Sequence, residues 1–90
     1  KALQLAKAAQ ARDSYAAAVL LAAYEKDKAG AAALLADFRA VAAAGLRGSK
    51  HSPVTGDAAR KALGAADTAI HRLGVNPTIV LTVLAARFRA

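Results

Sequence analysis

Apolar side chains recur at helical spacing along most of the chain, and no alternating run is long enough for a β-strand. Over residues 31–44, Leu34, Phe38 and Val41 form a seven-residue stripe, which a helix would turn toward a core. Over residues 56–73, the apolar positions at four-three spacing are Ala59, Leu63, Ala66, Ile70 and Leu73. Both stretches are therefore predicted to be amphipathic helices.

Two further helices follow from where helix-breaking residues occur. Residues 2–28 contain neither proline nor glycine, so this stretch is predicted to form one long first helix. Gly30 lies just after the charged residues 25–28, where the chain is expected to turn and where Asp27 can cap the next helix. The signals for the last helix, over 77–89, are Gly74 as a left-handed stop, Asn76 as N-cap, Pro77 as first helical residue and a Val75–Val80 staple.

Residues 45–55 form the loop of this pattern. The stretch from Gly45 to Gly56 holds three glycines, one proline and two serines. The sequence thus predicts one all-α domain over residues 1–90, a small up-down four-helix bundle with helices at about 2–28, 31–44, 56–73 and 77–89. Its expected core is Leu34, Phe38, Val41, Leu63, Ile70, Leu73, Leu81, Leu84 and Phe88.

Alanine accounts for 28 of the 90 residues, and this changes how the core must be built. Alanine has the highest helix propensity but buries little surface, so the helices have to approach closely. The chain has no cysteine, which excludes disulfides and thiolate sites. Its longest apolar stretches are Tyr15 to Tyr24 and Ile79 to Ala86, the second of which is broken by Thr82. Both are shorter than the roughly 20 residues of a membrane span, so no transmembrane segment is predicted.

A net charge of +7 indicates an acidic partner, which can be nucleic acid, anionic lipid or an acidic protein face. The basic residues around the loop and the first turns of the third helix are the predicted partner-binding set. These residues are Arg47, Lys50, His51, Arg60 and Lys61. Free amide groups at the start of a helix can receive an anion there. A solvated loop that is polar only for solubility explains the same residues.

Catalytic chemistry has little support in the sequence. The six carboxylates are scattered over predicted polar faces, and no two of them stand out as an acid and a base. His51 and His71 have no neighbouring carboxylate at metal-ligand spacing. We therefore predict that the protein is not an enzyme and that it holds neither a metal nor a cofactor.

Residues 69–83 follow the spacing of a helix-turn-helix motif, with Gly74 in the turn. The positive charge agrees with DNA binding through the third and fourth helices. However, the second of these helices would present Pro77, Thr78, Leu81 and Thr82 outward, a poor set for reading base edges. A tight corner between two ordinary helices explains the same residues.

From about Tyr24 onward, four short signals occur in a familiar order: Asp37-Phe38-Arg39, Gly45-Leu46 before a serine-containing loop, Ala62-Leu63-Gly64-Ala65-Ala66, and Asn76-Pro77. In this order the chain resembles the four-helix extrinsic proteins on the lumenal side of photosystem II. The resemblance implies a non-enzymatic subunit of the thylakoid lumen that docks on the photosystem core. We accordingly predict an organellar accessory subunit that docks on the acidic face of a larger complex. The alternative prediction is the DNA-binding module.

Overall fold

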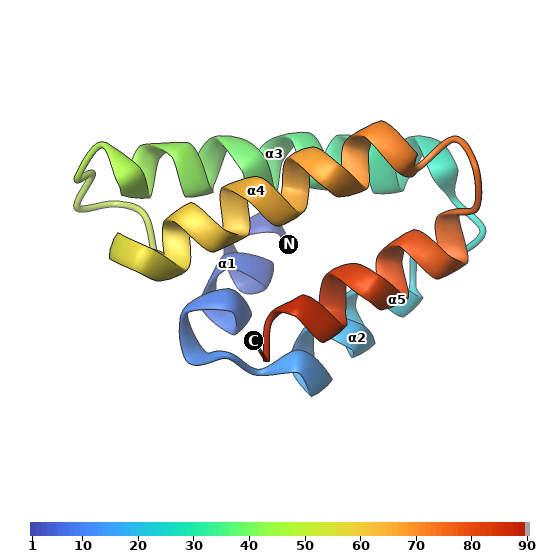
Figure 1. The fold of residues 1–90 in the computed structure, drawn as a ribbon, viewed down its shortest axis with the longest axis horizontal. Coiled ribbons are helices and arrows are strands. Elements are labelled where there is room, and N and C mark those ends of the chain that lie inside the picture. The colour runs from blue at the N-terminus through green and yellow to red at the C-terminus, as the bar shows by residue number, and fades with distance from the viewer. Residues whose placement is uncertain (90) are drawn as a thin grey trace.

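Five helices build the part of the chain that the structure describes, and the prediction of an all-α fold is confirmed. The structure is a computed structural model that describes residues 1–89. The helices are α1 (Ala2–Ala11), α2 (Ser14–Ala22), α3 (Lys28–Leu46), α4 (Gly56–Arg72) and α5 (Pro77–Arg87). α3 and α4 lie side by side in opposite directions along the long axis, and α2 packs against α5 (Figure 1). α1 lies between these pairs and contacts α2, α3 and α4.

The prediction of one helix over residues 2–28 is wrong, and so is the four-helix count that rested on it. α1 ends at Ala11, and its C-cap Arg12 adopts the left-handed conformation with φ of 56°. Asp13 then caps α2, because its carboxylate accepts a hydrogen bond from the Ala16 N–H at 3.0 Å. An aspartate that caps a new helix competes with continuation of the old one. The break lets α1 pack on α3 while α2 packs on α5.

The cap predicted at Asp27 is confirmed, but Gly30 does not break the helix and lies inside it. The Asp27 carboxylate accepts a hydrogen bond from the Gly30 N–H at 2.9 Å, so α3 begins before the glycine, at Lys28. A Cβ atom at residue 30 would lie 2.3 Å from Asp27 Oδ2. Gly30 therefore leaves room for the capping carboxylate.

The turn between α4 and α5 matches the sequence signals only in its second half. Asn76 caps α5 through the Ile79 N–H at 3.3 Å, and Pro77 is the first helical residue, as predicted. Gly74 is not left-handed, since the only glycines with positive φ in the described chain are Gly48 and Gly56. Val75 is 88 % exposed, so the predicted staple onto Val80 does not form.

Alanine supplies the inward face of α4, and this differs from the predicted face. The buried residues of α4 are Ala59, Ala62, Ala65, Ala66 and Ala69. Leu63 and Ile70, which were expected in the core, are only partly buried, as is Val41. The other six predicted core residues are buried. Because alanine is short, the face that points inward is the one that allows the closest approach to α3, and the leucine lies at its edge.

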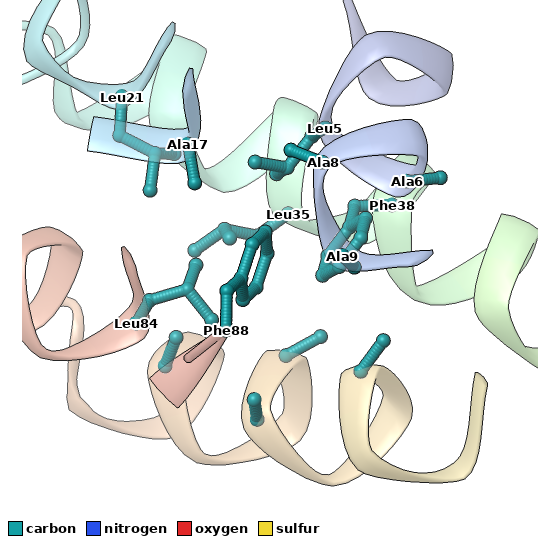
Figure 2. Close-up of a cluster of buried hydrophobic side chains, with 14 of the residues drawn as sticks. Leu5, Ala6, Ala8, Ala9, Ala17, Leu21, Leu35, Phe38, Leu84 and Phe88 are labelled. Carbon is teal, nitrogen blue, oxygen red and sulfur yellow. The ribbon is translucent and has the colours of Figure 1, made fainter. Parts of the chain in front are cut away.

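Phe38 of α3 and Phe88 at the end of α5 meet in the middle of the core. Their ring centroids are 5.8 Å apart and the planes are tilted by 36°. Leu5, Leu35 and Leu84 lie around them, so side chains from α1, α3 and α5 converge at one point (Figure 2). Offset aromatic pairs at this separation add to the free energy gained by burial.

By length and composition alone, α3 is a helix that could cross a membrane. The buried helix of a folded core and a signal sequence pass the same test, so this is weak evidence. Here α3 contacts both α1 and α4, and it buries Leu34, Leu35 and Phe38. In this fold α3 acts as a core helix.

Arg12 offers a test of the break between α1 and α2. We expect Arg12→Gly to raise the free energy of unfolding by about 1 kcal/mol, because glycine adopts the left-handed conformation without the steric cost of a Cβ atom. Chemical denaturation measures the change. Arg12→Ala is the matched control, since it removes the charge and keeps the strained conformation. An equal gain in both variants would assign the effect to charge and not to the backbone.

Candidate functional site

The loop over residues 47–55 is folded back onto α3. The Ser52 hydroxyl lies 2.8 Å from the Val54 carbonyl oxygen and 3.0 Å from that of Val41, and both carbonyls can accept its hydrogen bond. Val54 is fully buried. The backbone of this loop is thus held in place, while its predicted binding residues Arg47, Lys50 and His51 are exposed at its surface.

Arg60 and Lys61, the other two predicted binding residues, are engaged within α4. Both pair with the carboxylate of Asp57, Arg60 through a direct hydrogen bond and Lys61 with its Nζ at 3.5 Å from Oδ2. Asp57 lies in the first turn of α4, where its charge complements the helix dipole. The chain's own carboxylate is therefore present where the sequence predicted room for an external anion. Within residues 1–89 no hydrogen bond or ion pair joins the loop cations to Arg60 or Lys61.

The ion pairs of Asp57 with Arg60 and Lys61 lead to a prediction about pH. The hydrogen bond from Arg60, and then the charges of Arg60 and Lys61, hold the pKa of Asp57 below its ordinary value of 3.8. A lowered folded-state pKa means that the stabilisation is present above pH 3.8 and is lost as the pH falls through the folded-state value. An NMR titration should find the pKa of Asp57 below 3.8 in the wild-type chain and close to 3.8 in the Arg60→Ala/Lys61→Ala variant. Equal values in both proteins would contradict the pairing.

The structure instead gathers cations that the sequence analysis did not connect. Arg12 at the end of α1, Lys61 on α4 and Arg87 at the end of α5 line one small hollow, together with Asp57 and the edge of Phe88. We call the three basic residues the cationic hollow. They are far apart in sequence, and only the packing of α1 against α4 and α5 brings them together. The single carboxylate leaves an excess of two positive charges.

An apolar groove continues from the cationic hollow along the seam between α4 and α5. From α4 it is lined by Ala65, Thr68, Ala69 and Arg72. From α5 it is lined by Ile79, Val80, Val83, Leu84 and Arg87. We call this surface the α4–α5 groove. Arg87 and Ala65 belong to both the groove and the hollow, so the two are continuous.

The groove also shows how α4 and α5 are arranged. Residues at the start of α4, such as Ala58, share a hollow with Phe88, whereas Arg72 at its end shares one with Ile79. The two helices therefore run antiparallel along their whole length (Figure 1). The helices of a helix-turn-helix unit meet at about 90–120° instead. The spacing that suggests that motif is accommodated here by a helical hairpin.

The described residues offer few groups for catalysis or metal binding. They contain no cluster of three or more His, Asp or Glu side chains placed to hold a metal ion. The Nδ1 atom of His71 is 2.7 Å from the backbone oxygen of Asp67, and the Asp67 carboxylate pairs with Arg39 of α3. The His71 contact therefore lies within α4, and the Asp67–Arg39 pair joins α4 to α3.

Comparison with known proteins returns no relative for this chain. No protein-family model, no curated protein and no solved structure matches it.

Proposed function

We propose that this protein is a non-enzymatic accessory subunit that docks on the acidic face of a larger protein assembly. The observation that carries the proposal is the distribution of its charges. Most of the carboxylates form hydrogen bonds or ion pairs within the described chain, whereas most of the cations form no ion pair there.

Four of the six acidic residues have partners inside the chain. Asp13 and Asp27 accept hydrogen bonds from backbone N–H groups at helix starts. Asp57 and Asp67 pair with Arg and Lys side chains of α3 and α4. Only Arg39, Arg60 and Lys61 of the thirteen Lys and Arg residues form ion pairs in the described chain. The positive charge that remains faces outward and favours an acidic partner.

A protein partner explains more features of the exposed surface than a DNA partner does. Beside the cations the surface presents large exposed apolar side chains, including Val75, Ile79 and Val83. Such side chains add nothing to phosphate binding, but they are typical of protein interfaces. The antiparallel arrangement of α4 and α5 also supports a protein partner, because the helices of a helix-turn-helix unit cross at a wide angle. The lumenal side of photosystem II, implied by the sequence resemblance, stays the specific assembly that we propose.

Native cross-linking in the source cells tests the proposal. We expect a tagged full-length chain to sediment with a large assembly at about 0.1 M salt, and to be released at about 1 M, because salt screens exposed charges beyond roughly 3 Å at that concentration. Cross-linked peptides should map to an Asp- and Glu-rich face of the partner. Association with the lumenal face of thylakoids would support the specific assembly.

Two results would contradict this function. The chain could sediment at low salt as a free protein of 9.1 kDa, with no cross-linked partner. Alternatively, nuclease treatment could release it from the large fraction, which would favour the DNA-binding alternative. Nuclease should have no effect if the partner is a protein.

A further inference from the structure

We propose that the α4–α5 groove is the docking site for an acidic amphipathic helix of the partner. This inference rests on the proposed function and specifies which surface of the chain serves it. The groove combines an apolar floor, an exposed apolar rim and cations at both of its ends.

The rim of the groove is apolar without contributing to the core. Ile79 and Val83 lie one turn apart on α5 and are 59 % and 51 % exposed, and Val75, in the turn before this helix, is 88 % exposed. All three line hollows along the seam between the helices. Large apolar side chains that are exposed close together mark interaction sites more often than isolated ones do.

The floor of the groove allows a third helix to approach closely. On the α4 side it consists of Ala65 and Ala69, and the adjoining hollow includes Gly64. Small side chains let helix axes approach toward the low end of the usual 8–10 Å range. α5 has 11 residues, so the seam offers about 16 Å of length, or three turns of a bound helix. An extended strand would find no free backbone edge here, because both walls are helices.

The charges at the two ends select an acidic occupant. Arg72 lies at one end of the groove, and Arg87 lies at the other, beside Lys61 and Arg12. Asp57 is the one carboxylate at this surface in the described chain, and it is already paired with Arg60 and Lys61. A second copy of this chain carries +7 and would bring like charges together. A helix with acidic residues on both sides of an apolar stripe fits the groove, in the manner of helix-in-groove recognition.

Isothermal titration with synthetic helical peptides tests the groove directly. The probe is a peptide of about 14 residues with leucines at helical i, i+4, i+7 spacing and glutamates at its flanks. We expect it to bind the wild-type chain. A peptide with lysines in place of the glutamates should not bind, and one with serines in place of the leucines should bind at least about tenfold more weakly.

Matched variants of the protein locate the site. Ile79→Ser/Val83→Ser should weaken binding by at least about tenfold, because both side chains form the proposed contact. The control is Tyr15→Ser/Val19→Ser on α2, which removes apolar side chains of similar exposure outside the groove and should leave the affinity unchanged. Arg87→Glu should weaken binding, whereas Lys7→Glu, which changes an exposed cation of α1 outside the groove, should not. Amide NMR spectra verify that each variant is folded.

The outcomes separate this inference from the proposed function. The proposed role of the groove is contradicted if no acidic peptide binds, or if the α2 variant loses as much affinity as the groove variant. It is also contradicted if the chain binds a second copy of itself at the groove. Suppose that groove variants still sediment with the large assembly while charge-reversed chains do not. Docking on an acidic partner then stands, and the groove is not its site. If the inference is correct, neither the groove variants nor the charge-reversed chains should sediment with the large assembly.

Discussion

Replacing Phe38 by alanine is expected to lower the free energy of unfolding by about 3–5 kcal/mol. The side chain is fully buried in α3, and its ring packs against Phe88 at 5.8 Å between centroids. Leu5, Leu35 and Leu84 lie around the ring, but they are held on packed helices, so they would fill the cavity only in part. Domains of this size have about 5–15 kcal/mol of stability, so the loss is a large part of the total.

Thermal denaturation followed by circular dichroism measures this effect. The melting temperature should fall by more than about 12 °C, since 1 kcal/mol corresponds to roughly 4–8 °C in a domain of this size. Leu63→Ala serves as the control, because Leu63 is only partly buried and should cost less than about 2 kcal/mol. If Phe38→Ala does not fold, Phe38→Leu should fold with a smaller loss of stability, because it leaves a smaller cavity. A larger loss from Leu63→Ala than from Phe38→Ala would contradict the observed orientation of the helices.

Gly45→Ala is expected to destabilise the protein by at least about 2 kcal/mol, although alanine favours helices more than glycine does. A Cβ atom at residue 45 would lie 1.9 Å from the Val54 carbonyl oxygen and 3.0 Å from Ser52 Oγ. The carbonyl belongs to the backbone and cannot rotate away, so the loop would have to move off α3. This movement would expose Val54 and break the hydrogen bonds of Ser52.

Gly64→Ala provides the matched comparison for Gly45→Ala. Both glycines lie inside helices, but a Cβ atom at residue 64 would meet no atom within 4 Å. Gly64→Ala should therefore raise the free energy of unfolding by up to about 1 kcal/mol, through helix propensity alone. Urea denaturation of the two variants measures the difference. Stabilisation by both substitutions would show that the loop does not pack against α3 at residue 45.

Part of the candidate site could be predicted from the sequence and part could not. The excess of positive charge and the exposure of the loop cations Arg47 and Lys50 follow from composition and from the loop signals. The pairing of Arg60 and Lys61 with Asp57 has a local signal, because residues three and four apart share a helix face. The cationic hollow has no such signal. Its three cations come from the ends of α1 and α5 and from the second turn of α4, so they meet only through long-range packing.

The sequence by itself determined the all-α class, most helix ends and the caps at Asp27 and Asn76, because propensity and capping act between residues a few positions apart. Only the tertiary structure decided that α1 and α2 pack on different neighbours, that α4 turns its alanines inward, and that α4 and α5 form a groove with arginines at its ends. An alanine-rich helix has several faces of nearly equal apolar character. Its own sequence therefore fixes its rotation only weakly, and the choice falls to the closest packing with its neighbours.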